Sequence, residues 1–137
     1  MAVTAYVGTR HYRQELTVDS KSLGRTRRIV AAFMRYWGLG KLVDPAVVCV
    51  TELLANVSRH AGSTCVLVVR ATDSGVRIVV SDGSTRHPVV REPDWSDESG
   101  RGMVLISTLA SSWGVTPTDT GKDVWVELRT AASEEAA

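Results

Sequence analysis

The chain has 137 residues, of which 44% are hydrophobic and 23% are charged, as is typical of one globular domain with a substantial core. Sixteen Lys and Arg residues against fifteen Asp and Glu residues leave a formal net charge of +1, so no overall field directs the protein to nucleic acid. No apolar run is long enough to span a membrane, and the N-terminus lacks a signal-peptide core. A cytoplasmic protein is therefore expected.

The first third of the sequence predicts a strand followed by a helix. Residues 1–11 have no periodicity and are predicted to form a flexible lead-in, whereas residues 12–18 predict a short strand at a sheet edge. Asp19 or Ser20 can cap a helix that extends to about residue 37. Its predicted buried face consists of Leu23, Val30, Phe33, Met34 and Trp37. Four arginines of this segment fit either an acidic partner surface or a solvated helix face: Arg25, Arg27, Arg28 and Arg35.

A second helix is predicted over residues 44–62. Asp44 can act as its N-cap, Pro45 suits the first helical position and Gly62 can close it. Apolar residues at three- and four-residue spacing predict its buried face: Val47, Val50, Leu54, Val57 and Ala61.

A polar stripe follows the same helix, because Glu52, Asn56 and His60 recur every four residues. An amide oxygen is a neutral ligand for Mg²⁺, and a carboxylate one turn away can order or deprotonate a hydroxyl beside it. The stripe therefore fits a metal–nucleotide site. A solvated polar face is the alternative that this helix alone leaves open.

Two strands rich in β-branched residues follow, at 64–71 and 75–82, and the turn Thr72-Asp73-Ser74 between them predicts a hairpin. In the second strand, Asp82 shares a face with three apolar residues, which places a carboxylate at the core layer. A ligand is one partner that would stabilise an acid there. Cys49 and Cys65 have no neighbour at ligand spacing and are predicted to be small buried residues.

Residues 83–99 contain turn residues and no helical or strand periodicity of apolar residues, so they are predicted to form a loop. A loop of this length is typical of a functional lid or a disordered segment. Gly100-Arg101-Gly102 then opens a helical run, where backbone N–H groups suit a phosphate. A closing hairpin is predicted from residue 113 to residue 129, around Asp119-Thr120-Gly121, and a disordered tail over 131–137.

Three separated motifs occur along the chain in this order: ELLANVSRH, VVSDGS and ESGRGMVLI. Together they resemble the GHKL ATPases, whose nucleotide pocket is the Bergerat fold. The resemblance is closest to the anti-sigma-factor serine/threonine kinases, especially the stand-alone actinobacterial type, and covers residues 12–130. It implies a histidine-kinase-like ATPase domain with an α/β (α+β) two-layer sandwich. The expected sheet is mixed, mostly antiparallel, with about five strands and three helices on one face.

The resemblance also implies roles for the motif residues. Asn56 would hold Mg²⁺ and Glu52 would be the catalytic base. Asp82 would accept a hydrogen bond from the adenine amino group, and as an ionised acceptor it would repel the guanine carbonyl. The phosphates would contact Gly100, Arg101 and Gly102. His60 would either contact the nucleotide or pack at the pocket wall.

Two departures from the family pattern lie near the expected pocket. After Asp82 the sequence runs Gly83-Ser84-Thr85-Arg86, where the wider superfamily usually has a second glycine two residues beyond the first. Ser84 is familiar in the actinobacterial branch and is a candidate nucleotide contact with its own loop geometry. The lid is short and carries acids at Asp94, Asp97 and Glu98, so enclosure of the γ-phosphate could depend on a partner.

The implied activity is transfer of the ATP γ-phosphate to a Ser or Thr of an anti-anti-sigma (STAS-domain) partner, with ATP and Mg²⁺ as cofactors. The implied second partner is a sigma factor, held by direct binding, and a homodimer is a further expectation. A non-catalytic, ATP-gated module that sequesters a regulator is the main alternative. A nucleic-acid-binding regulator using the arginine-rich helix is disfavoured by the balanced charge.

Overall fold

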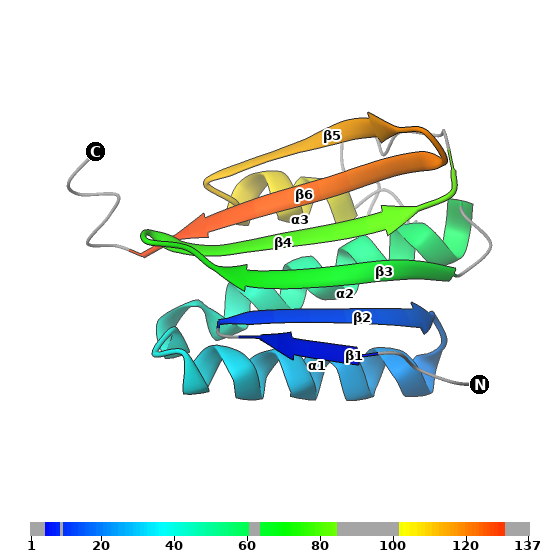
Figure 1. Cartoon of the computed structure of the whole chain (residues 1–137). Helices are drawn as coiled ribbons and strands as arrows, with labels where there is room; N and C mark the ends of the chain where they lie inside the picture. Colours follow the sequence, from blue (N-terminus) through cyan, green and yellow to red (C-terminus); the bar gives the residue numbers. More distant parts are fainter. Residues whose placement is uncertain (1–4, 9, 61–63, 85–101, 131–137) are drawn as a thin grey trace.

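The structure, a computed structural model, describes residues 5–8, 10–60, 64–84 and 102–130. These residues form one sheet of six strands in the order β1-β2-β3-β4-β6-β5 (Figure 1). Every neighbouring pair of strands is antiparallel. The strands are β1 (Ala5–Gly8), β2 (His11–Thr17), β3 (Thr64–Ala71), β4 (Gly75–Asp82), β5 (Ser112–Thr118) and β6 (Gly121–Arg129).

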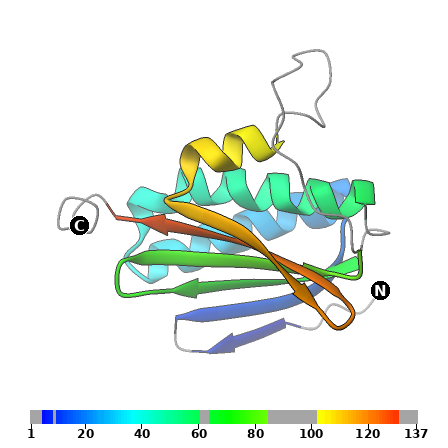
Figure 2. The ribbon, with the colours of Figure 1, turned by 90° about the horizontal axis from the view of Figure 1, so that it is seen from above.

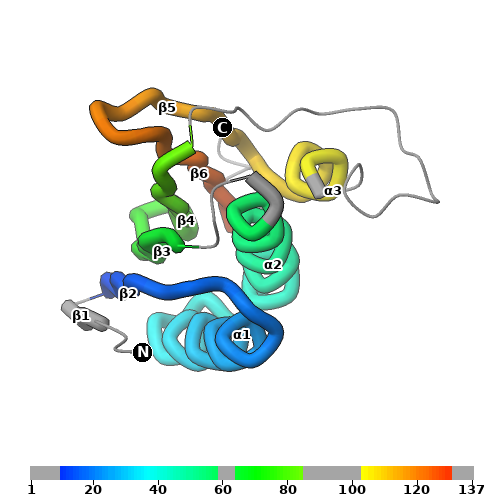
Figure 3. Tube along the Cα trace, turned by 90° about the vertical axis from the view of Figure 1, so that its right-hand side faces the viewer, coloured from blue at the N-terminus to red at the C-terminus, as the bar shows by residue number. Residues whose placement is uncertain are grey.

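Three α-helices cover one face of this sheet, as the view from above shows (Figure 2). They are α1 (Ser20–Tyr36), α2 (Val43–His60) and α3 (Gly102–Leu109), and a short 3-10 turn, η1 (Gly40–Leu42), precedes α2. Seen along the strands, α2 lies between α1 and α3 in the helical layer (Figure 3). The α+β two-layer sandwich predicted from the sequence is confirmed.

The sheet has one strand more than the expected five, and no parallel pair among the strands described. Ala5–Gly8 forms β1 within the segment predicted to be a flexible lead-in, and it pairs with β2 from Ala5 opposite Gln14 to Gly8 opposite His11. As a result β2 has neighbours on both sides, so its predicted position at the sheet edge was wrong. A segment of four residues is too short to show an alternation of apolar and polar side chains. A strand of this length is therefore recognised only from its pairing with a neighbouring strand.

The helix α1 begins and ends where the sequence predicts. The Asp19 side chain accepts from the Ser22 backbone N–H at 2.8 Å, and the Ser22 hydroxyl accepts from the Asp19 backbone N–H at 2.9 Å, which completes a capping box. Gly38 follows the C-cap Trp37 with φ of 79°, a left-handed conformation that favours glycine. Val30 and Met34 are buried, and Leu23, Phe33 and Trp37 pack against the core.

The helix α2 begins at Val43, so Asp44 lies in its first turn and is not the predicted N-cap. An acid in this turn still stabilises the helix through the macrodipole. The buried face of α2 is broader than the predicted stripe and consists of Val43, Ala46, Cys49, Val50, Leu53, Leu54 and Val57. Val47 is only half-buried, and residues 61 and 62 lie outside the described residues.

The inner face of the sheet supplies the other half of the core. In β4 the side chains of Val76, Ile78 and Val80 are buried, and in β6 those of Val124, Val126 and Leu128 are buried. Alternate side chains of a strand point to opposite faces of the sheet, and both predicted hairpins form. This alternation also places Asp82 and Lys122 in the same layer, at the ends of the two apolar rows.

Candidate functional site

Asp82 is the last residue of β4 and lies at the end of the inner face, 9% exposed. The strand registers place it directly opposite Cys65 of β3 and Lys122 of β6. The sequence predicted an acid in this layer, and the structure confirms its burial.

Lys122 is the ionic partner of Asp82. Its Nζ atom lies 2.9 Å from Oδ1 and 3.1 Å from Oδ2 of the carboxylate. The side chains of Lys122 and Asp82 are only 5% and 3% exposed, so the ion pair is shielded from solvent. Burying an isolated charge is costly, and each member of this pair neutralises the other.

Lys122 was not among the predicted site residues, because the sequence predicts the last strand from Val124 to Arg129, beyond this lysine. The residue nevertheless lies in phase with Val124 and Val126, two and four positions further along β6. Two features of the sequence could have identified Lys122. It shares a strand face with apolar residues that point inward, and its strand can pair with a strand that ends in an acid.

Ser84 joins this cluster through its backbone. Its N–H donates to Oδ1 of Asp82 at 2.8 Å, and its carbonyl oxygen lies 3.4 Å from Nζ of Lys122. The bond from Asp82 to the N–H two residues later is an Asx-type turn, which ends β4 and turns the chain. Ser84 therefore helps to fix the carboxylate of Asp82.

Gly121 allows this close arrangement. A Cβ atom built on Gly121 would lie 2.0 Å from the carbonyl oxygen of Asp82 and 2.7 Å from Cα of Gly83. No other residue type fits there without movement of the backbone. The start of β6 can thus approach the end of β4 and place Lys122 opposite Asp82.

Glu52 and Asn56 lie one turn apart on α2, and both are half-buried beside its apolar face. The amide nitrogen of Asn56 donates to the sulfur of Met103 on α3 at 3.2 Å. Because sulfur is an acceptor, this contact directs the nitrogen to α3 and makes Oδ1 the atom that could coordinate Mg²⁺. A half-buried amide oxygen with a carboxylate one turn away fits a magnesium ion bound to nucleotide phosphates.

The described parts of the predicted site lie on one side of the molecule. The C-terminal half of α2, the end of β4 and the start of β6 meet there, and α3 begins nearby (Figures 1 and 2). Gly102 is the first residue of α3, and His60 is the last residue of α2 with its side chain outside the described residues. Gly100, Arg101 and residues 85–99 of the predicted loop also lie outside the described residues.

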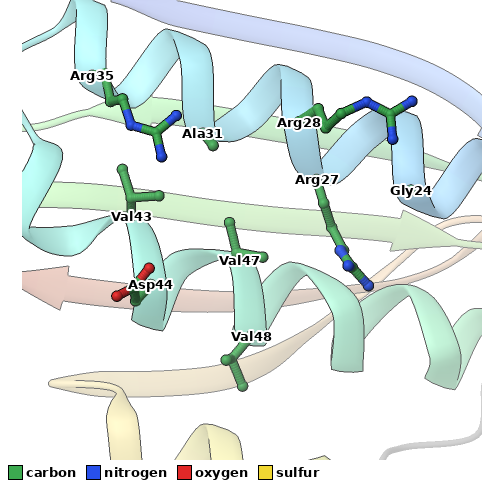
Figure 4. Close-up of a pocket in the computed structure, with 9 residues that line it drawn as sticks. All are labelled: Gly24, Arg27, Arg28, Ala31, Arg35, Val43, Asp44, Val47 and Val48. Carbon is green, nitrogen blue, oxygen red and sulfur yellow. The ribbon is translucent and has the colours of Figure 1, made fainter.

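A separate groove of about 750 Å³ lies between α1 and α2 (Figure 4). Its rim carries the exposed side chains of Arg27, Arg28 and Arg35, with Asp44 as the one acid among the described lining residues. Its apolar lining comes from Ala31, Val43, Val47 and Val48. Arg25 is exposed on α1 but does not line the groove. The arginines thus border apolar surface, unlike a purely solvated helix face.

This fold, with an acid ending a central strand and an acid–amide pair on the neighbouring helix, defines a GHKL-type ATPase domain. The family model of the histidine kinase-like ATPase domain matches residues 16–128, and the chain belongs to this family. The match includes Glu52, Asn56, Asp82 and Lys122, and family membership supports ATP binding and a kinase or regulatory role. No curated protein matches the sequence. None of the described helices is long and apolar enough to cross a membrane.

Proposed function

We propose that this ATPase domain is an anti-sigma-factor serine/threonine kinase, which phosphorylates a STAS-domain partner and sequesters a sigma factor. The observation that carries the proposal is the placement of Glu52 one helical turn from Asn56, at the flank of α2 that contacts α3. A domain that only bound nucleotide would need the metal ligand and the base acceptor, but not a carboxylate beside the metal.

In this reaction Asn56 would hold Mg²⁺ through Oδ1, and the ion would supply positive charge against the phosphates. Asp82 anchors the base. Glu52 orients the hydroxyl of the partner and accepts its proton as the hydroxyl oxygen bonds to the γ-phosphorus and the bond from that phosphorus to ADP breaks. Most of the acceleration comes from positioning and charge neutralisation, so the base contributes only one part of it.

The groove between α1 and α2 supports the partner half of the proposal. Three exposed guanidinium groups around an apolar floor fit an acidic segment that also carries apolar side chains. Reversing charge by Arg27→Glu and Arg35→Glu should weaken partner binding without changing ATP affinity. Arg25→Glu is the matched control, because this exposed arginine lies on the same helix outside the groove.

A single-turnover assay of phosphate transfer from ATP to STAS-domain proteins tests the kinase directly. Glu52→Gln should keep ATP binding and lower the transfer rate by roughly 10²–10⁴-fold, the usual contribution of a positioned general base. Glu15→Gln, at an exposed position of β2, is the control. An undiminished rate in Glu52→Gln would remove the base role. Absence of transfer by the wild type to any STAS partner would favour the ATP-gated sequestering module.

A further inference from the structure

The base-binding end of the site contains a donor as well as an acceptor. Nζ of Lys122 contacts both carboxylate oxygens of Asp82, at 2.9 and 3.1 Å. An isolated carboxylate presents only acceptors to a bound base, and it repels a carbonyl oxygen. An ammonium group held against it changes which base edges the site can bind.

The hydrogen bonds already present indicate where a base can attach. Oδ1 accepts from both Lys122 and the backbone N–H of Ser84. Among the described residues, Oδ2 accepts only from Lys122. Because a carboxylate oxygen accepts about two hydrogen bonds, the remaining position lies on Oδ2. A base nitrogen bonded there at about 2.9 Å would lie on the order of 4–5 Å from Nζ, so Nζ can reach the neighbouring atom of the base edge.

We propose that Lys122 determines the purine specificity of this site. With adenine, the 6-amino group donates to Asp82 and N1 accepts from Lys122. With hypoxanthine or guanine, N1–H donates to Asp82 and the 6-oxo group accepts from Lys122. Because donor and acceptor exchange places between the two base edges, a 6-oxo purine binds displaced along its edge relative to adenine. In that position the pair admits 6-oxo purines, which Asp82 alone would reject. This inference rests on the nucleotide site of the proposed function, but not on its kinase activity.

The surroundings of Lys122 keep its ammonium group at the base edge. The residue is 4% exposed, so the charge stays beside Asp82 and does not extend into solvent. Its backbone is fixed by pairing with Asp82 across β4 and β6 and by the close approach at Gly121. Lys122 therefore meets the base as a positioned donor.

Calorimetric titrations with the magnesium complexes of ATP and ITP test this role, because the two nucleotides differ only in the base edge that the pair contacts. The affinity of the wild type for ITP should lie within about tenfold of its affinity for ATP. Lys122→Met keeps a similar side-chain volume and removes one hydrogen bond from each nucleotide. Only ITP is then left with a 6-oxo group beside the Asp82 carboxylate and no cation between them, so ITP should weaken relative to ATP by about tenfold or more. Lys122→Arg should retain the wild-type ratio. Lys21→Met, at an exposed position of α1, is the control.

The ratio of the two affinities separates specificity from stability, since a purely structural role would lower both affinities together. A ratio in Lys122→Met within about threefold of the wild-type ratio would overturn the proposal. A wild-type affinity for ITP more than about a hundredfold weaker than that for ATP would also overturn the proposal. This measurement needs no folded variant. If the wild type binds no nucleotide, the proposed function fails together with this inference; if it binds ATP with an unchanged ratio in the variant, only the inference fails.

Discussion

Buried and half-buried polar residues form the candidate site at the scale of single side chains. Asp82 is held by an ammonium group and a backbone N–H, and Asn56 by the sulfur of Met103. Each polar group thus has a partner before nucleotide binds, and its orientation is fixed in advance. Preorganised groups lose less freedom when a ligand arrives, which favours affinity.

Asn56 provides the test of the proposed magnesium site. Asn56→Ala removes the amide oxygen and the weak contact to Met103, and the side chain is half-buried at the edge of α2, so the fold should remain stable. ATP affinity should lose its dependence on Mg²⁺, which titrations with and without the ion can measure. Asn56→Asp, which restores an oxygen ligand, should regain part of that dependence. Full magnesium-dependent affinity in Asn56→Ala would show that the metal ligand lies elsewhere.

The pairing of β4 with β6 is the element that brings the site together. Gly121 has no room for a Cβ atom beside the carbonyl of Asp82, so the two strands meet only if that position is glycine. The same contact positions Lys122. A change at Gly121 should therefore affect stability and nucleotide binding together.

Gly121→Ala should lower the free energy of unfolding by roughly 1–3 kcal/mol, because the backbone must move to relieve the overlap. It should also weaken ATP binding. Gly40→Ala is the matched control, because no heavy atom of the described chain lies within 4 Å of its added Cβ; its effect should stay within about 0.5 kcal/mol. Urea unfolding of the two variants measures the difference. Equal stabilities would mean that the strands can separate at little cost.

The elements with strong periodicity were predictable from the sequence. The helix α1 with its N-cap, the broad extent of α2 and the hairpin of β3 with β4 follow from caps, turn residues and alternation. Asp82 was predicted to lie in the core layer because it alternates in phase with the apolar residues of the same strand. The strand β1 and the partner Lys122 were not found, because both depend on pairing between strands, which local patterns do not specify.

At the scale of the whole molecule, the core contains three groups that resist ionisation. Burial raises the pKa of Tyr12 to about 12 and, with a smaller contribution from Glu52, the pKa of Cys49 to about 11. Burial, together with the nearby charge of Asp82, raises the pKa of Cys65 to about 12. Both cysteines are free thiols in the core, as the sequence predicted.

These shifts predict a loss of stability in alkaline solution. The unfolded chain releases the thiol protons near pH 9, whereas the folded protein retains them up to pH 11 or 12. The stabilisation is therefore complete below pH 9 and falls as pH rises toward the folded-state values. Urea unfolding at increasing pH should show this decline, and a Cys49→Ala/Cys65→Ala variant should show a shallower one. Parallel declines in both proteins would contradict the assignment to the thiols.

The location of the nucleotide site is tested most directly by NMR titration of the ¹⁵N-labelled protein with magnesium ATP. The largest changes in amide chemical shift should occur in the C-terminal half of α2, at residues 82–84, at the start of β6 and in α3. The groove between α1 and α2 should change little. Absence of shifts at millimolar ATP, or shifts confined to that groove, would contradict a nucleotide site built on Asn56 and Asp82.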